Sequence, residues 1–356
     1  MSLKKFYVIV FAFAFLFLIA FAPLAVAAEG TRTVVDMGGT EVTLPMEVNR
    51  VIDMWHANNQ VVLLLGGADK LIGTTEVIQQ LPWYGKVYPR IRDVKAFTGP
   101  NISGFNAEEV LAAKPDVVIV STQKDAEVLR NAGITAVFVT FRDFDGLKET
   151  VRVTAKVLGG DAEERAEKFI SYFEGNLQLL NDRLGDLPDS QRPKVYEVRS
   201  PNPLDTDGRV SICTEWLAAA GGVNAIADIA EDNQTTVTME EVLKADPDYI
   251  IIGTQNAVGS QNADPIAEKI KNAPEWSTVK AVKEGRVYTN PVGTFLWARY
   301  SCEEALQVLW VAKLLHPDKF ADIDLTKQVR DFYKTFYDFD LTDADAERML
   351  AGRDPL

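Results

Sequence analysis

Residues 106–120 read NAEEVLAAKPDVVIV, and residues 238–252 read TMEEVLKADPDYIII. The two stretches correspond position by position at an offset of 132 residues. Each predicts a short helix with a capping residue at its start, then a Pro-Asp turn, then a buried strand. A unit that occurs twice in this way indicates two lobes of similar architecture.

Helix and strand patterns alternate around both copies. Strands are predicted at 50–54, 117–121, 136–140, 195–198 and 249–253. Helices are predicted at 58–65 and 214–220, and a Gly-Gly pair ends each of them. This alternation indicates the α/β class with mostly parallel sheets, whose ligands bind beyond the carboxyl ends of the strands.

Between the two copies, apolar residues recur at every third or fourth position over a long stretch. The stripe predicts one backbone helix at 161–184, begun by a capping box of Asp161 and Glu164. A strongly amphipathic helix is predicted at 301–315, and a helical pair at 325–350.

The predicted architecture is two Rossmann-like lobes joined by a single long helix, with a ligand cleft between the lobes. The N-terminal lobe spans 29–143, and the C-terminal lobe spans 193–320. A helical connector at 144–192 contains the backbone helix, and a helical tail at 321–356 ends the chain.

The first residues are typical of a secretory signal peptide at 1–28. Lys4 and Lys5 precede an apolar run at 6–22, and the small-residue pattern Ala-Val-Ala follows at 25–27. The apolar run of 17 residues is at the lower limit for spanning a bilayer, so an uncleaved membrane anchor is the less favoured interpretation. We therefore expect a periplasmic or extracytoplasmic protein.

Composition and motifs exclude several classes of function. The chain carries 51 acidic against 37 basic residues, which leaves no basic surface for nucleic acid. It has two histidines, His56 and His316, so a metal site with several histidine ligands is excluded. No G-x-S-x-G, H-E-x-x-H or Walker motif occurs, and we expect a binding protein rather than an enzyme.

Five stretches together resemble the helical-backbone class of ABC-transporter substrate-binding proteins, which carry iron–siderophore, haem and cobalamin complexes. They are the repeated E-x-V-L-x-x-x-P-D-x-x-I element, LLLGGADKLIG within 61–73, LAAAGGVN at 217–224, LWVAKLLHPDKF at 309–320 and FYKTFYDFDLT at 332–342. The resemblance implies a monomer that delivers a metal chelate to an ABC importer permease and needs no intrinsic cofactor. It also implies that Glu108 and Glu240 dock into arginines of that permease, whereas Glu109 and Glu241 suit a capping role.

Candidate ligand contacts are residues at strand ends and in the loops beyond them: Trp55, His56, Asn58, Trp83, Tyr84, Arg142, Arg199, Trp297, Arg299 and Tyr300. Aromatic rings and arginine forks suit a bulky anionic chelate, and a ferric siderophore fits best. Haem with Tyr300 or His56 as axial ligand, cobalamin, and an oxyanion such as molybdate or tungstate remain alternatives. The structural interpretations also stay open, with the arginines in surface salt bridges and the segment at 79–84 packed under its loop.

Two further functions and one covalent bond are left open by the sequence. A secreted enzyme would have to be built on His56, and a ligand-sensing receptor module would use the same cleft. Cys213 and Cys302 form either a disulfide, as an oxidising compartment favours, or two separate buried thiols.

Overall fold

The N-terminal lobe is built on a parallel sheet of five strands in the computed structural model, which describes residues 30–99, 104–253 and 262–356. The predicted signal peptide lies outside the described residues. The sheet has the order β5-β4-β3-β6-β7. Its strands are β3 (Val51–Asp53), β4 (Leu71–Thr75), β5 (Lys95–Thr98), β6 (Val117–Val120) and β7 (Ala136–Phe138).

The C-terminal lobe contains a smaller parallel sheet with the order β10-β8-β12-β13. Its strands are β8 (Lys194–Val198), β10 (Val223–Asn224), β12 (Tyr249–Ile252) and β13 (Val287–Thr289). Two antiparallel pairs complete the strands: β1 (Thr31–Val35) with β2 (Glu41–Pro45), and β9 (Asp205–Thr206) with β11 (Thr235–Thr236). The α/β class with mostly parallel sheets, predicted from the alternating pattern, is confirmed.

The helices of the N-terminal lobe are α1 (His56–Leu64), α2 (Glu76–Gln80), α3 (Pro82–Val87), α4 (Ala107–Ala112) and α5 (Gln123–Asn131). Those of the C-terminal lobe are α8 (Ile212–Ala219), α9 (Met239–Ala245), α10 (Asp264–Asn272), α11 (Lys280–Lys283) and α12 (Glu304–Leu315). The connector forms α6 (Phe144–Leu158) and α7 (Ala162–Leu184), and the tail forms α13 (Leu325–Phe336) and α14 (Asp343–Leu350). No helix of the described ranges is long and apolar enough to span a bilayer.

Both copies of the repeat fold as predicted. Asn106 caps α4 by accepting the N–H groups of the next two acidic residues, and Thr238 forms a full capping box with Glu241 at the start of α9. The capping role predicted for Glu109 is wrong, because its carboxylate pairs with Lys95 instead, at 2.6 Å.

The Pro-Asp turn of each copy is tied to the strand that opens its lobe. Asp116 accepts the backbone N–H of Arg50, next to β3, at 2.8 Å, and Asp248 accepts that of Lys194 in β8 at the same distance. Each turn therefore aligns its own strand, β6 or β12, with the central strand beside it.

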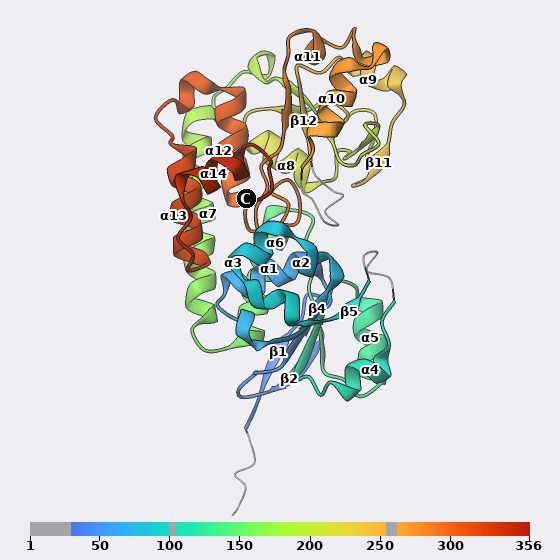
Figure 1. The fold of residues 1–356 in the computed structure, drawn as a ribbon, viewed down its shortest axis with the longest axis vertical. Helices are drawn as coiled ribbons and strands as arrows, with labels where there is room; N and C mark the ends of the chain where they lie inside the picture. Colours follow the sequence, from blue (N-terminus) through green and yellow to red (C-terminus); the bar gives the residue numbers. More distant parts are fainter. Residues whose placement is uncertain (1–29, 100–103, 254–261) are drawn as a thin grey trace, which may run out of the picture. The chain divides into compact units, whose positions relative to one another are not determined.

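The predicted backbone helix is confirmed as α7, a single helix of 23 residues. In Figure 1 it runs along one side of the molecule beside α12 and α13. The predicted capping box at its start is wrong, since Asp161 has helical dihedral angles and its side chain accepts no capping hydrogen bond. Instead Gly159 and Gly160, with φ of +67° and +65°, make the sharp corner between α6 and α7.

Helix α12 departs from the amphipathic helix predicted at 301–315. It begins at Glu304, and nearly all of its residues are buried, including Glu304 and Gln307. The reason is its position, because it packs against α7, α8 and α13. Hence polar residues that looked solvent-facing lie in the interior.

A single glutamine of α1, Gln60, joins the two lobes. Its amide nitrogen donates to Thr294 Oγ1 and to Glu303 Oε2, both at 2.9 Å. Its amide oxygen accepts the Ser301 hydroxyl at 3.1 Å and the Cys302 backbone N–H at 2.7 Å. The side chain is fully buried, so every polar atom of its amide is satisfied by the C-terminal lobe.

The tail returns from the C-terminal lobe to the N-terminal one. Trp83 donates its indole N–H to the carbonyl oxygen of Arg353 at 2.9 Å, and Lys86 pairs with Asp345 at 2.7 Å. The tail is therefore a second tie between the lobes, beside the backbone helix.

We predict that Gln60→Leu lowers the free energy of unfolding by about 3 kcal/mol, because it leaves the Cys302 N–H buried without an acceptor and removes one of the donors to the Glu303 carboxyl group. Urea unfolding followed by circular dichroism measures this loss. Gln307→Leu is the matched control, since that buried glutamine bonds to Asn290 within one lobe. The radius of gyration from small-angle scattering should rise for Gln60→Leu alone, and an unchanged urea midpoint in that variant would refute the interpretation.

Candidate ligand-binding site

The strand order of each sheet identifies where a ligand would bind. In the N-terminal lobe the chain runs outward from β3 through β4 and β5, then continues on the other side through β6 and β7. In the C-terminal lobe the same reversal lies between β8 and β12. Open α/β sheets bind ligands at the carboxyl ends of strands beside such reversals. Trp55 and His56 follow β3, and Arg199 follows β8. Three of the predicted ligand contacts therefore lie at the carboxyl ends of strands beside these reversals.

Three aromatic rings, two from the N-terminal lobe and one from the C-terminal lobe, pack against one another beyond the carboxyl ends of the strands. Trp55 lies 5.3 Å from Phe141 and 6.3 Å from Tyr300 between ring centroids, and Phe141 lies 5.6 Å from Tyr300. Tyr300 has a φ of +57° and belongs to the loop before α12. A left-handed tyrosine is strained, so packing against the other two rings must hold it in place. Trp55 and Tyr300, predicted as ligand contacts, are thereby brought together.

The turn from β3 into α1 is shaped by a buried carboxyl group that the sequence analysis did not single out. Asp53 accepts the backbone N–H of Trp55 at 3.0 Å and the amide of Asn58 at 2.8 Å. Asn58 in turn accepts the hydroxyl of Thr154 at 3.0 Å. Its amide therefore serves this internal network, and burial raises the pKa of Asp53 to about 8.

His56 begins α1 and packs against Phe295, with 5.3 Å between the ring centroids. Its Nδ1 atom is buried and has no hydrogen-bond partner among the described residues. Burial lowers the pKa of the imidazole to about 4, so the ring is neutral at pH 7. A neutral imidazole still donates one hydrogen bond or binds a metal through one nitrogen.

Trp83 and Tyr84 lie in the hydrophobic core. Both side chains are fully buried, and the Tyr84 hydroxyl donates to the carbonyl oxygen of Asn59 at 2.9 Å. Of the two interpretations open for this segment, packing under the loop is the one that the structure supports.

Arg299 is enclosed by acidic groups in the C-terminal lobe. It forms an ion pair with Asp207 and lies near Glu197, and all three side chains are buried. Burial raises the pKa of Glu197 to about 7, although Arg299 and Arg199 act to lower it. The positive charge of Arg299 is thus used inside the protein, which explains why it does not extend into solvent.

Among the residues that the structure describes, Glu197, Asp207 and Cys213 have donor atoms close enough to hold a metal, all within 4.8 Å of one another. The guanidinium group of Arg299 already supplies the positive charge there, so a cation would have to displace it. Sequence reasoning missed Glu197 and Asp207. The signal for Glu197 was available, because a carboxylate interrupts the apolar strand KVYEV at 194–198.

The other two arginines predicted as ligand contacts, Arg142 and Arg199, are more exposed to solvent than Arg299. Arg142 follows β7 and is exposed, with no ion pair recorded for it within the described ranges. Arg199 follows β8 and is half-buried. These two arginines, one on each lobe, follow the carboxyl ends of β7, an edge strand, and of β8, which lies beside the reversal of its sheet.

Trp297 is fully buried, and its indole nitrogen has no acceptor within the part of the chain that the structure describes. Trp216 of α8 donates its own indole N–H to the carbonyl oxygen of Ala298 at 3.0 Å. This bond fixes the loop that carries Trp297, Arg299 and Tyr300.

Of the two alternatives left open for the cysteines, the structure shows the separate thiols. Cys213 and Cys302 are separate, buried thiols, and burial raises the pKa of each well above its ordinary value. Both side chains are packed in the hydrophobic core, so the loop between them is closed by packing rather than by a covalent bond.

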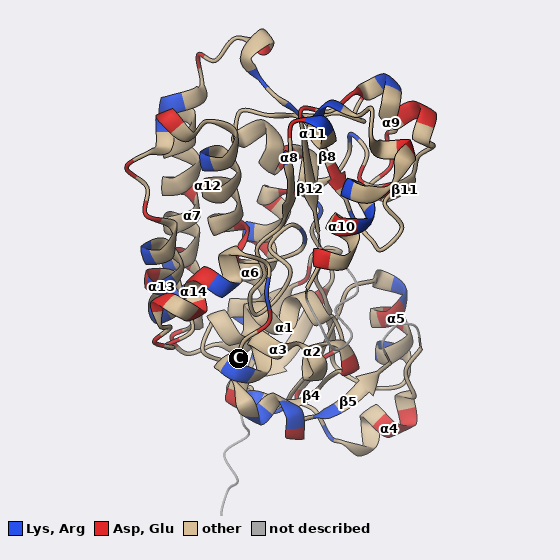
Figure 2. Cartoon of the chain, turned by 45° about the horizontal axis from the view of Figure 1, so that its top comes forward, with Lys and Arg blue, Asp and Glu red and all other residues tan. Residues whose placement is uncertain are grey.

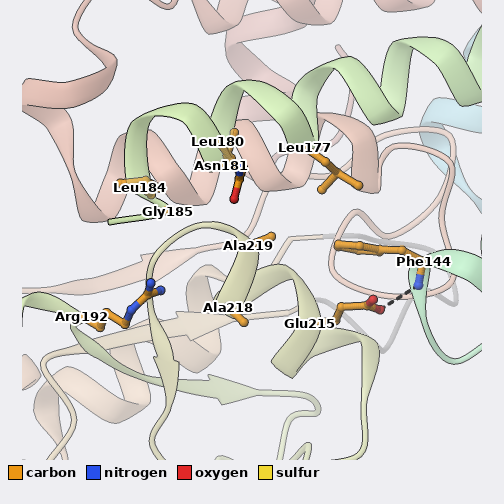
Figure 3. Close-up of a pocket in the computed structure, with 10 residues that line it drawn as sticks. All are labelled: Phe144, Leu177, Leu180, Asn181, Leu184, Gly185, Arg192, Glu215, Ala218 and Ala219. Atoms are coloured by element: carbon orange, nitrogen blue, oxygen red, sulfur yellow. Dashed lines mark hydrogen bonds between the residues drawn. The ribbon is translucent and has the colours of Figure 1, made fainter. Parts of the chain in front are cut away.

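A pocket of about 440 Å³ lies between α7 and α8, outside the predicted ligand contacts (Figure 3). Leucines of α7 form one wall, and Arg192 and Glu215 stand at its edges. Glu215 accepts the backbone N–H of Phe144 at 2.7 Å, which ties the start of α6 to α8. None of its ten lining residues is a predicted ligand contact.

The fold and the lobe junction define a two-lobed α/β solute-binding protein. The chain belongs to the periplasmic binding protein family, whose model matches residues 56–292. Proteins of this family described below are binding proteins associated with transport.

Among its relatives is the molybdate-binding protein MolA of Haemophilus influenzae, 27% identical over 88% of this chain and 93% of the relative. The structure of MolA with molybdate bound is 24% identical, covers 87% of this chain and 99% of that one, and has a TM-score of 0.77. A periplasmic solute-binding protein of Veillonella parvula is 29% identical with a TM-score of 0.78, covering 90% and 97%. The iron(3+)-hydroxamate-binding protein YxeB of Bacillus subtilis is 22% identical over 71% of this chain and 76% of the relative.

We predict that His56 weakens the fold in acid. Its pKa is about 4 in the folded chain against 6.5 as the ordinary value, so the unfolded chain takes up a proton first as the pH falls. Through this group the folded state should lose up to about 3 kcal/mol between pH 6.5 and pH 4. His56→Gln lacks the group, so the difference in unfolding free energy between wild type and variant should change across that range. A constant difference from pH 7 to pH 4 would contradict a buried neutral imidazole, and the carboxyl groups with raised pKa cancel because both proteins carry them.

Proposed function

We propose that this protein binds a small tetrahedral oxyanion of the molybdate class between its lobes, outside the cytoplasm, and delivers it to an ABC importer. The observation that carries the proposal is the burial of most of the aromatic residues predicted as ligand contacts. Trp55, Trp83, Tyr84 and Trp297 are all buried in packing and offer little surface to a bulky chelate. What remains at the junction are hydrogen-bond donors, which an oxyanion requires.

Four donor groups support an anionic ligand. His56 Nδ1 and the Trp297 indole nitrogen are buried without an acceptor among the residues described, and such groups cost free energy until they are paired. Arg142 and Arg199 add positive charge in the segments that follow β7 and β8. The relative named for molybdate aligns over most of both chains and agrees with this chemistry.

A ferric siderophore is the second candidate. Arg142 is exposed and the ring of Tyr300 is partly exposed, so one cation and one aromatic face are accessible to a larger anion. A relative named for an iron(3+)-hydroxamate complex supports the same possibility. In either case the chain would act as a monomer without a cofactor of its own, exported by the signal peptide at 1–28.

Delivery to the permease would use Glu108 and Glu240. Both lie in the first turn of their helices, α4 and α9, and both are exposed. Within the described residues neither carboxylate has an ion pair, whereas the acid that follows each is engaged by Lys95 or by the capping box. Figure 2 shows acidic residues on both helices, one in each lobe. Two free carboxylates at equivalent places suit a partner with two matching arginines.

We predict that Arg142→Gln weakens molybdate binding at least tenfold, since a charge-assisted hydrogen bond contributes about 1.5–3 kcal/mol. Isothermal titration of the purified protein with molybdate measures the affinity. Arg209→Gln is the control, because Arg209 is exposed on the C-terminal lobe and pairs with Glu231. If the wild-type protein binds a ferric hydroxamate and does not bind molybdate, the oxyanion proposal is rejected in favour of the ferric siderophore.

We predict that the double variant Glu108→Gln/Glu240→Gln abolishes uptake and leaves ligand affinity unchanged, because both residues lie outside the junction. Uptake of radiolabelled molybdate by cells that express the importer measures the first effect, and titration measures the second. Glu163→Gln is the control, as Glu163 is also an exposed acid in the first turn of a helix. Normal uptake by the double variant would reject the docking role.

A further inference from the structure

Two exposed leucines occupy equivalent positions in the repeat. Leu111 of α4 and Leu243 of α9 are separated by the same 132 residues that relate the two copies. Their exposed fractions are 51% and 41%, high values for large apolar side chains. Each leucine follows the proposed docking glutamate by three residues, so it lies beside that glutamate on one face of its helix. Both lobes therefore present a carboxylate next to a branched apolar group.

The two copies of the repeat do not need these leucines in order to pack against their lobes. The apolar residue that anchors each short helix is the preceding valine, Val110 or Val242, and both valines are fully buried. A polar side chain at the leucine position would serve an isolated helix equally well. An exposed leucine leaves apolar surface in water, which is unfavourable unless a partner covers it.

The exposed positions around the pair differ between the copies. Ala112 corresponds to Lys244, and Lys114 corresponds to Asp246, so two of the neighbouring positions change their charge. The first acid and the leucine are the same in both copies. The two acids and the leucine therefore recur, whereas the exposed positions that follow them do not.

We propose that Leu111 and Leu243 belong to the permease-docking surface, where each enters an apolar recess beside the arginine that receives the neighbouring glutamate. The proposal rests on the docking role given above to Glu108 and Glu240. Exposed ion pairs contribute little by themselves, because water and salt screen them. An apolar contact next to the pair excludes water and strengthens it. Because the pattern occurs once on each lobe, the partner must offer the same recess twice.

The test uses Leu111→Gln, Leu243→Gln and the double variant, because glutamine keeps the helix propensity of leucine. Binding to the cognate ABC importer, reconstituted in lipid nanodiscs, is measured by surface plasmon resonance. We expect each single variant to bind at least fivefold more weakly and the double variant at least twentyfold, with an unchanged thermal midpoint. Val128→Gln is the matched control, since Val128 is 44% exposed on α5, outside the repeat, and this variant should bind as the wild type does.

The glutamate variant separates this inference from the proposed function. If the leucine double variant binds within twofold of wild type while Glu108→Gln/Glu240→Gln loses binding, the leucine proposal is overturned and the docking role stands. If neither double variant changes binding, the docking role itself fails, and the leucine proposal fails with it. An equal loss in Val128→Gln would also overturn the proposal, because the effect would then belong to any exposed apolar residue.

Discussion

The amide of Gln60 is the contact on which the arrangement of the two lobes depends. It is buried, and all of its hydrogen bonds go to the segment 294–303 of the other lobe. A buried amide is costly to leave unpaired, so the position of that segment is fixed by the requirement to satisfy it. Glu303, the acid that Gln60 contacts, is held in turn by the hydroxyl of Tyr333 from the tail. The tail and both lobes thus converge on one polar cluster.

This cluster explains how a strained loop can form the site. Tyr300 has a left-handed backbone conformation directly before Ser301, one of the residues that Gln60 binds. On its other side the loop is held by the bond from Trp216 to Ala298. With both ends of the loop tied and Trp55 packed against Tyr300, the junction is formed before a ligand arrives. Capture should therefore require little movement of the lobes, in keeping with a stiff helix as the connector.

Most of what the sequence predicted correctly depends on local order, although the capping roles predicted for Asp161 and Glu109 were wrong. The repeat, the strands and the backbone helix follow from hydrophobic periodicity and turn residues, which act over a few positions. The burial and the partners of Trp83, Arg299 and the cysteines depend on contacts between residues that are far apart in the sequence. The indole N–H of Trp83 donates to a carbonyl oxygen 270 residues away in the sequence, and no local sequence pattern predicts that partner. The same limit explains α12, whose polar residues are buried because three other helices surround it.

The charges around the lobe junction bear on the proposal that this acidic chain binds an anion. Its net charge is −14, but two buried acids beside Arg299 carry less negative charge than this total suggests. Asp207 is paired with Arg299, and the pKa of Glu197 is raised to about 7, so this carboxyl group is partly protonated near neutral pH. A negative ligand beside Glu197 would favour the protonated form further, which reduces the repulsion between them. In the proposed complex Arg142 and Arg199 would supply positive charge to the anion, so a net charge calculated for the whole chain is a poor guide to what its junction binds.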